Sequence, residues 1–510
     1  MRGIVVASLV LAGFTGIGGL RSNVDAAAPS PTATTTVTAP AATPTPHAAA
    51  RSATIAAGYD HTCVILAGEV LCWGGQPYNY PSRTIPLSEP APVAGLNGVT
   101  SIAAGASNSC AVAQSTLRCW GSNQRGELGI GRTSWWEPEP QPVNGITAGV
   151  AMVSVGTGHA CAIDMQGAVW CWGDGQGGEL GTGPLGPGAI KESPVRVEAL
   201  KRPAIDIAVG GWSGSNFGCY VFGCAHSCAV TDDGGVECWG DNGYGELGAS
   251  STSTCEHKSS GPPMTAPFPC SPTPVRVEGL HGAALSVAVG NQFTCAVTSG
   301  GNVECWGIND SGQLGARMTQ VCAAEPAAPC SSAPVVVNGV GAPVSSLALG
   351  RAHACALTES GGVKCWGDNY IGQLGDGTNT GSSVPRDVVG LQSSVVAIAA
   401  GGDHTCALMA SGGVRCWGGN YSGELGDGTF FSKSRPVDVI GLTAAPPAPS
   451  TAVPEITPSA VALPSTGGGR RDRRAPCEQI ALGLASAGIA CAAAGVRTRR
   501  RSAGGPSGCE

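Results

Sequence analysis

The stretch "GGDHTCALMASGGVRCWGGNYSGELGDGT" (residues 401–429) holds two cysteines ten residues apart, Cys406 and Cys416. A tryptophan follows the second cysteine directly, and glycines recur throughout. The segments "HTCAL" and "GVRCW" alternate with period two around a glycine-rich turn, which is typical of a β-hairpin. Reflecting the first segment about Ser411 places the cysteines opposite each other, and facing Cβ atoms in antiparallel pairs lie roughly 4.5–5.5 Å apart. The stretch therefore predicts a hairpin closed by a cross-strand disulfide.

The same unit occurs seven times, which indicates a repeat architecture. Cys-Trp-Gly recurs at Cys72, Cys119, Cys171, Cys238, Cys305, Cys365 and Cys416. The partner cysteine lies nine residues earlier in the first two copies and ten earlier in the others, at Cys63, Cys110, Cys161, Cys228, Cys295, Cys355 and Cys406.

A short apolar run ending in Gly opens each unit, and a run such as "PVRVEGL" (274–280) closes it. Each unit thus has four short strands, and its glycines suit tight turns with positive φ and crowded strand corners. We expect an all-β, seven-bladed β-propeller of four-stranded blades over residues 53–442. An open β-solenoid is the alternative, but seven complete units without a helical pattern between them favour closure.

The beginning of the chain resembles an export signal. Residues 1–28 contain Arg2, an apolar run and then small residues, which predicts a secretory signal peptide. Residues 29–52 are mostly Ala, Pro and Thr, and the same composition returns in 443–462. We expect the first segment to be a disordered spacer and the second a Pro-rich linker.

The pentapeptide Leu463, Pro464, Ser465, Thr466 and Gly467 matches the L-P-x-T-G sorting signal of Gram-positive surface proteins. That resemblance implies cleavage by a sortase after Thr466 and attachment to the cell wall, with 463–510 as sorting signal, weak hydrophobic segment and basic tail. The departure is "GGRRDRRAPCE", which puts four arginines before an apolar run barely long enough for the roughly 20 residues that span a bilayer. A degenerate tail on a freely secreted protein and a C-terminal membrane anchor remain alternatives.

The cysteine count supports export. The chain has 23 cysteines, of which Cys477, Cys491 and Cys509 lie beyond the sorting signal. The other 20 can all be paired: seven hairpin pairs, and three local pairs inside insertions, Cys219/Cys224, Cys255/Cys270 and Cys322/Cys330. Such pairing suits an oxidising compartment. Zinc sites are the alternative, but the blade cysteines lack C-x2-C spacing, so we expect no metal and no cofactor.

Net charge limits the partners. The whole chain carries −7, and residues 470–510 contribute +5, so the remainder carries −12. An acidic domain is a poor polyanion binder, because phosphate contacts need Lys and Arg. We expect no nucleic-acid partner, and a membrane only transiently through the C-terminal segment.

The repeat "AxGxxHTCALxxxGGVxCWGxNxxGQLG", with close copies at 369–378 and 420–429, resembles the regulator of chromosome condensation family. The resemblance covers 53–442 and implies a seven-bladed propeller. The eukaryotic namesake is a nuclear exchange factor for the GTPase Ran that docks on chromatin, and a bacterial relative inhibits β-lactamases. The signal peptide, disulfides and acidic charge argue against nuclear exchange, and fold alone does not fix function.

Several recurrent polar residues are interpreted as structural. The repeated histidine is expected to make a blade-internal hydrogen bond to backbone, with Asn108 and Phe293 filling its position elsewhere; the five are His61, His159, His226, His353 and His404. An acid and an amide interchange in the "GELG" turn, which excludes a general acid or base but suits a turn-stabilising side chain; the residues are Glu127, Glu179, Glu246, Gln313, Gln373 and Glu424. The Cys-Trp tryptophans are expected to pack inside the blades. No catalytic constellation is recognised.

The sequence thus predicts a non-enzymatic extracellular binding propeller, displayed on the cell wall of a Gram-positive bacterium, whose partner is an extracellular protein or wall component. A secreted hydrolase inhibitor and an enzyme using the central funnel are the alternatives.

In a four-stranded antiparallel blade, the first-to-second and third-to-fourth connections emerge on the same face. Three long insertions lie in such connections and therefore share one face: 211–224, 249–274 and 316–333. We expect the partner to contact that face over blades four and five, unless the insertions are tolerated decorations. The candidate partner-binding residues are Trp135, Trp136, Trp212, Phe217, Tyr220, Phe268 and Met318.

Overall fold

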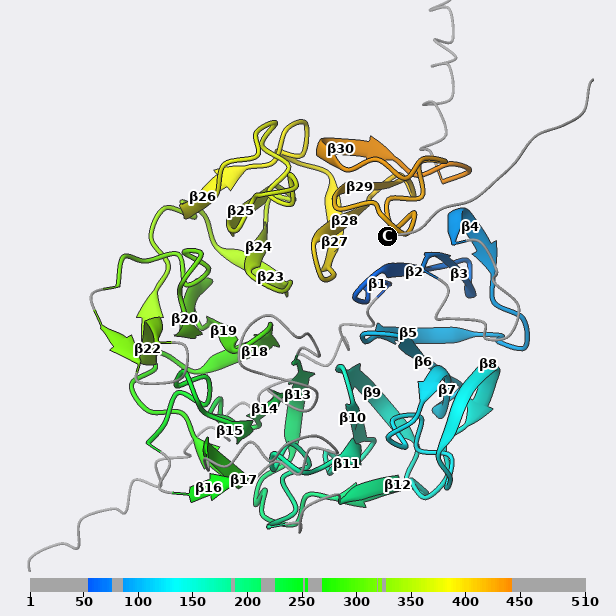
Figure 1. Cartoon of the computed structure of the whole chain (residues 1–510), viewed down its shortest axis with the longest axis vertical. Helices are drawn as coiled ribbons and strands as arrows, with labels where there is room; N and C mark the ends of the chain where they lie inside the picture. The colour runs from blue at the N-terminus through cyan, green and yellow to red at the C-terminus, as the bar shows by residue number, and fades with distance from the viewer. Residues whose placement is uncertain are drawn as a thin grey trace, which may run out of the picture. The chain divides into compact units, whose positions relative to one another are not determined.

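The computed structural model describes residues 54–75, 86–184, 189–211, 225–250, 253–255, 268–318, 320–322 and 327–442. These residues form seven antiparallel sheets, arranged as the blades of a closed ring (Figure 1). Each sheet is contiguous in sequence, so the predicted seven-bladed all-β propeller is confirmed. The expected signal peptide, spacer, linker and sorting signal fall outside the described residues. Among the residues that are described, no helix is long and apolar enough to cross a membrane.

Every blade contributes one strand to each of four radial positions. The innermost strands surround the centre: β1 (Ile55–Ala57), β5 (Val99–Ala104), β9 (Val150–Val155), β13 (Ala204–Val209), β18 (Ala284–Val289), β23 (Val344–Leu349) and β27 (Val395–Ala400). The second strands carry the first cysteine of each pair: β2 (His61–Leu66), β6 (Asn108–Ala113), β10 (His159–Asp164), β14 (His226–Thr231), β19 (Phe293–Thr298), β24 (His353–Thr358) and β28 (His404–Met409).

The third strands carry the Cys-Trp-Gly: β3 (Glu69–Gly74), β7 (Thr116–Asn123), β11 (Val169–Asp174), β15 (Val236–Asp241), β20 (Asn302–Ile308), β25 (Val363–Gly367) and β29 (Val414–Gly418). The outermost strands close the blades: β4 (Leu87–Pro92), β8 (Ser134–Pro142), β12 (Ile190–Arg196), β17 (Phe268–Arg276), β22 (Ala328–Val336), β26 (Ser382–Asp387) and β30 (Lys433–Asp438). In blades four and five a short fifth strand is added at the outer edge: β16 (Ser253–Cys255) and β21 (Val321–Cys322).

The central hairpin has the predicted register. In blade seven Cys406 lies opposite Cys416 across β28 and β29, with their Cα atoms 4.1 Å apart and a disulfide between them. The ladder to the outer strand shifts register between Cys416 and Gly418, and Gly418 has φ +98°. A glycine suits this bulge because left-handed backbone strains other residues. The described residues hold nine of the ten expected disulfides, while Cys219 and Cys224 lie outside them.

The core of the ring lies between blades. At the interface of blades six and seven, the disulfide Cys355–Cys365 and Leu374 pack against Trp417 of the following blade. The same set recurs around the ring, and at the closure the disulfide of blade seven and Leu425 pack against Trp73 of blade one. The tryptophans are therefore packing residues, as expected, but they join neighbouring blades instead of filling one blade.

The disulfides give the first testable prediction. All 20 cysteines of residues 53–442 should be oxidised, and reduction should raise the intact mass by about 20 Da, two hydrogens per bond. Replacing Cys406 by Ser should lower the free energy of unfolding by about 2–4 kcal/mol at most, because the closed loop is short. Free thiols in this segment, or bridges between different blades, would contradict the pairing.

Candidate functional site

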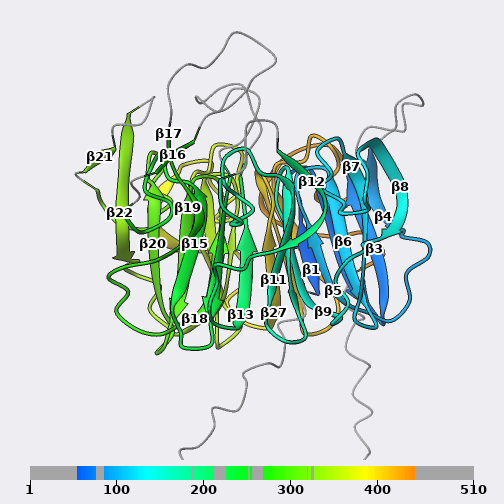
Figure 2. The ribbon, with the colours of Figure 1, turned by 90° about the horizontal axis from the view of Figure 1, so that it is seen from below.

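The connections between strands divide the propeller into two faces. Strand order within each sheet is sequential and antiparallel, so the first-to-second and third-to-fourth connections of every blade emerge on one side, here called the loop face. The short second-to-third turns emerge on the opposite side, here called the turn face. The loop face is uppermost in Figure 2, where β16 and β21 lie near its edge.

The described parts of two insertions belong to this face and are held to the sheet. The Cys255–Cys270 bridge joins β16 to β17, and the Cys322–Cys330 bridge joins β21 to β22. These insertions therefore end earlier than the sequence bounds of 249–274 and 316–333 suggest, because β17 begins at Phe268 and β22 at Ala328. Each also approaches the preceding blade: the sulfur of Cys255 lies 3.6 Å from the carbonyl oxygen of Gly177.

The candidate partner-binding residues are not equally accessible. Trp135 is exposed, and it lies with Trp136 near the start of strand β8; the sequence had predicted that both lie in the loop between the third and fourth strands. Trp136 is half-buried, and its Cη2 would lie 2.9 Å from a Cβ added to Gly121. Phe268 is half-buried opposite Cys255, and Met318 packs against the core between blades five and six. Trp212, Phe217 and Tyr220 lie outside the described residues.

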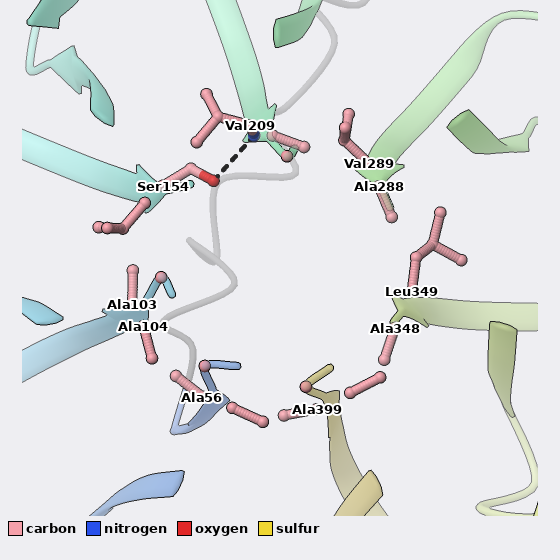
Figure 3. Close-up of a pocket in the computed structure, with 18 of the residues that line it drawn as sticks. Ala56, Ala103, Ala104, Ser154, Val209, Ala288, Val289, Ala348, Leu349 and Ala399 are labelled. Carbon is pink, nitrogen blue, oxygen red and sulfur yellow. Dashed lines mark hydrogen bonds between the residues drawn. The ribbon is translucent and has the colours of Figure 1, made fainter. Parts of the chain in front are cut away.

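A central funnel of about 960 Å³ is lined by the innermost strands. Figure 3 shows small side chains, such as Ala56, Ala348 and Ala399, around its open centre. Among the described lining residues only Asp206 and Arg351 carry charge. Both are engaged: a carboxylate oxygen of Asp206 accepts from the backbone N–H of Val287 at 3.0 Å, and Arg351 donates to Asp403 at 2.8 Å.

The recurrent histidine joins two blades. His404 Nε2 lies 2.8 Å from Thr62 Oγ1, across the closure between blades seven and one. The Thr62 hydroxyl donates in turn to the carbonyl oxygen of Glu424 at 3.2 Å, so Nε2 carries the proton that meets the hydroxyl oxygen. The indole N–H of Trp73 donates to the same carbonyl at 2.8 Å. The expected blade-internal bond from imidazole to backbone is therefore wrong.

The partner of each histidine follows from the repeat itself. The residue before the first cysteine of the next blade supplies the hydroxyl, and the pairs are His61–Ser109, His159–Ser227, His226–Thr294, His353–Thr405 and His404–Thr62. Where Asn108 and Phe293 replace the histidine, the next blade has Ala160 and Ala354 at this position. The hydroxyl is thus present only where an imidazole meets it, a pattern that comparing neighbouring repeats could have found.

The interchangeable acid or amide caps its own turn. Gln373 Oε1 accepts from the backbone N–H of Ile371 at 3.0 Å, and Glu246 Oε2 accepts from that of Tyr244 at 2.7 Å. This shared contact is the turn-stabilising role that the sequence predicted. The other terminal atom of the side chain differs between the two residues. Gln373 Nε2 is a donor and bonds to the Asp368 carboxylate at 3.1 Å, whereas Glu246 has a second carboxylate oxygen and meets the like charge of Asp241.

Burial and the neighbouring Asp241 raise the pKa of Glu246 well above its usual value. Burial also raises the pKa of Glu424, to about 7. The described residues contain no cluster of side chains able to hold a metal ion. Both carboxyls are buried in the interior of the ring.

The repeats match a known family. One profile described as the regulator of chromosome condensation (RCC1) repeat covers residues 118–163, 166–214, 233–297 and 360–408. A second profile of the same description covers 285–313, 344–373 and 395–424. The chain is built of RCC1 repeats.

Relatives of this RCC1-repeat propeller differ widely in size. The human E3 ubiquitin-protein ligase HERC2 is 30% identical over 325 residues, which are 62% of this chain and 6% of HERC2. The mitochondrial RCC1 domain-containing protein RUG3 of Arabidopsis thaliana is 29% identical over 293 residues, 57% of this chain and 58% of RUG3. The chain thus spans a small part of HERC2 and little more than half of RUG3.

Solved structures agree on the fold. Prp20p of Saccharomyces cerevisiae, described with its binding properties to Gsp1p and histones, superposes with a TM-score of 0.56 at 18% identity, covering 73% of this chain and 85% of Prp20p. This likeness shows the propeller fold.

Sequence reasoning missed a group of exposed aromatic residues. Tyr370 and Tyr421 are 80% and 72% exposed, and Phe431 is 74% exposed. All three lie in the third-to-fourth connections of blades six and seven, and therefore on the loop face. The signal was present in "NYIGQLGDGT" and "NYSGELGDGT", where a tyrosine follows the asparagine, but these segments were interpreted only as copies of the family repeat.

Proposed function

We propose that this RCC1-repeat propeller is a non-enzymatic binding protein that works outside the cell, attached to the cell wall, and holds a partner on its loop face. The buried disulfide at the centre of every blade carries this proposal. The described residues contain nine disulfides, seven in the blades and two in the insertions, and such bonds persist in oxidising compartments.

The funnel supports binding over catalysis. Its described lining is mostly Ala, Val, Gly and Ser, and its two charged side chains are already bonded. General acid–base chemistry needs a titratable group within hydrogen-bond reach of a substrate. Prp20p, which has the same fold, is described by what it binds, and HERC2, which is named as a ligase, matches this chain over only 6% of its length.

Attachment to the wall is tested at the sorting signal. Replacing Thr466 by Ala should remove the side chain that the L-P-x-T-G signal requires at the cleavage position, so that the sortase no longer cuts there, and the protein should move from the wall-bound fraction to the membrane or medium. Fractionation of cells followed by immunoblotting measures this, with Ser465→Ala as the matched control because the third position of L-P-x-T-G is variable. If the fractionation of Thr466→Ala were unchanged, sorting would be rejected, and the interpretation as a freely secreted protein with a degenerate tail would remain.

A further inference from the structure

Exposed aromatic side chains in the described part of the chain gather on the loop face. They lie at the ends of strands or in loops that open on this side: Tyr59, Trp135, Tyr370, Tyr421, Phe430 and Phe431. The exposed Met165, by contrast, lies in a second-to-third turn, and Leu285 lies at the turn-face end of β18. Five of the six aromatic residues belong to blades six, seven and one, which are consecutive because blade seven closes onto blade one. Aromatic residues are enriched where proteins bind partners.

The repeat does not require these tyrosines. Tyr370 and Tyr421 occupy one repeat position, immediately after an Asn of the turn, and blades two to five have Gln124, Gln176, Gly243 and Asp310 there. The backbone N–H of Tyr370 donates to Asp368 at 3.1 Å, a bond that any residue except proline could make. Fold stability therefore does not explain two aromatic side chains that remain largely exposed.

The charges around these residues favour a cationic partner. Asp60 follows Tyr59 in the chain, and Asp368 and Asp376 lie on either side of Tyr370. One basic group nearby, Arg351, is already neutralised, since it contacts Asp403 at 2.8 Å and Asp368 at 3.8 Å, while the exposed Arg435 lies beside Gly377.

Lys433 of blade seven is paired in the same way, since its Nζ lies 3.6 Å from Asp427. Residues 53–442 as a whole contain 17 basic and 30 acidic side chains. A surface with this balance attracts cations and orients them on approach.

We propose that the loop face over blades six, seven and one is a docking surface for a lysine- or arginine-rich segment of a protein partner. Tyr370 and Tyr421 stack against the aliphatic stems and cationic heads, and the surrounding carboxylates neutralise the charge. This inference rests on the proposed binding function, and it centres the contact away from blades four and five, where the insertions alone had suggested it.

The probe is a fluorescein-labelled 16-residue peptide of alternating Lys and Ala, with a Glu-Ala peptide of equal length as its counterpart. Binding to the full chain is measured by fluorescence anisotropy at low and at physiological salt. The wild type should bind the Lys peptide and not the Glu peptide. The double variant Tyr370→Ala/Tyr421→Ala should weaken binding at least tenfold, and Tyr370→Phe/Tyr421→Phe should stay within threefold of wild type, because phenylalanine keeps the ring.

A control variant and a folding measurement complete the test. Met165→Ala/Leu285→Ala on the turn face should leave affinity unchanged, and thermal melting should show all variants folded, because the substituted side chains are exposed. Equal binding of the double alanine variant and wild type would overturn the inference, since net charge alone would then account for the peptide. Loss of binding only on shortening 249–267 and 317–327, with Cys270 and Cys330 replaced by Ser so that no unpaired thiol remains, would place the contact over blades four and five instead.

Two results separate this inference from the proposed function. If the chain binds insoluble wall polysaccharide through the same tyrosines and not the Lys peptide, the cationic partner is wrong although a binding propeller remains. If Thr466→Ala also leaves fractionation unchanged, wall attachment fails separately, since the peptide assay does not depend on location.

Discussion

Replacing Trp417 by alanine should lower the free energy of unfolding by about 3–5 kcal/mol, as is usual when a buried aromatic side chain is truncated. Trp417 is fully buried between blades six and seven, against the disulfide Cys355–Cys365 and Leu374. Its indole N–H donates to the carbonyl oxygen of Gln373 at 2.9 Å. The truncation leaves both a cavity and a buried carbonyl with one donor fewer. Urea unfolding of the oxidised protein, followed by fluorescence of the remaining tryptophans, measures the change.

Trp135 supplies the matched control for Trp417. Its side chain is 61% exposed, so Trp135→Ala should change stability by no more than about 0.5 kcal/mol. The loss of unfolding free energy in Trp417→Phe should lie between those of Trp417→Ala and Trp135→Ala, because phenylalanine keeps most of the packing and loses the hydrogen bond. If Trp417→Ala were as mild as Trp135→Ala, the inter-blade clusters would not be what holds the ring together.

The propeller could be predicted because the same local sequence pattern, that of a hairpin with facing cysteines, occurs seven times. Cys406 and Cys416 are close in sequence, and period-two alternation fixes which side of the hairpin each occupies. Face assignment followed from strand parity, which needs only the order of the strands. These features depend on neighbours within about 40 residues, where the sequence pattern is direct.

The contacts between blades were harder to predict because they join one repeat to the next. The bond from His404 to Thr62 spans 342 positions, and its hydroxyl partner is recognisable only when successive copies are compared. The need for glycine in the "GQLG" turn has the same origin. A Cβ on Gly375 would lie 2.7 Å from Nε1 of Trp417 in the following blade, at φ +68°. The exposure of the Tyr370 side chain likewise depends on whether a neighbouring blade packs over it, which the sequence of its own repeat does not show.

Buried histidines and buried carboxyls should make stability depend on pH in opposite directions. Burial lowers the pKa of His159 to about 4 and that of His404 to about 3, and His226 and His353 behave like His404. An unfolded histidine titrates near 6.5, so between that pH and the lowered value the unfolded chain binds more protons. The stability contributed by these imidazoles is complete above about pH 6.5 and is lost as the pH falls.

The carboxyls work the other way. Glu424 has its pKa raised to about 7 by burial, so the folded protein binds its proton more tightly than the unfolded chain does. Its contribution is complete below the unfolded value of about 4.3 and is lost as the pH rises through 7. Glu179 and Glu246 have raised pKa values for the same reason, with Asp174 and Asp241 adding like charge. The two classes oppose each other between about pH 4.5 and 6.5, where stability should be greatest.

Stability should change more at acid pH than at neutral pH, because the contributions of four imidazoles are lost together there. Each contributes roughly 1.4 kcal/mol per unit of pKa shift. The free energy of unfolding, measured by urea denaturation with intact disulfides, should therefore fall by several kcal/mol between pH 5 and pH 3. The repeat provides the matched variant: His404→Phe/Thr62→Ala copies the natural pair of Phe293 and Ala354 and removes one imidazole together with its hydroxyl. This variant should lose less stability on acidification than wild type, by up to about a quarter of the total. The single change Thr62→Ala keeps the imidazole and should preserve the full pH dependence. If wild type and the double variant fell in parallel below pH 5, the inter-blade histidines would not be the groups that acid disrupts.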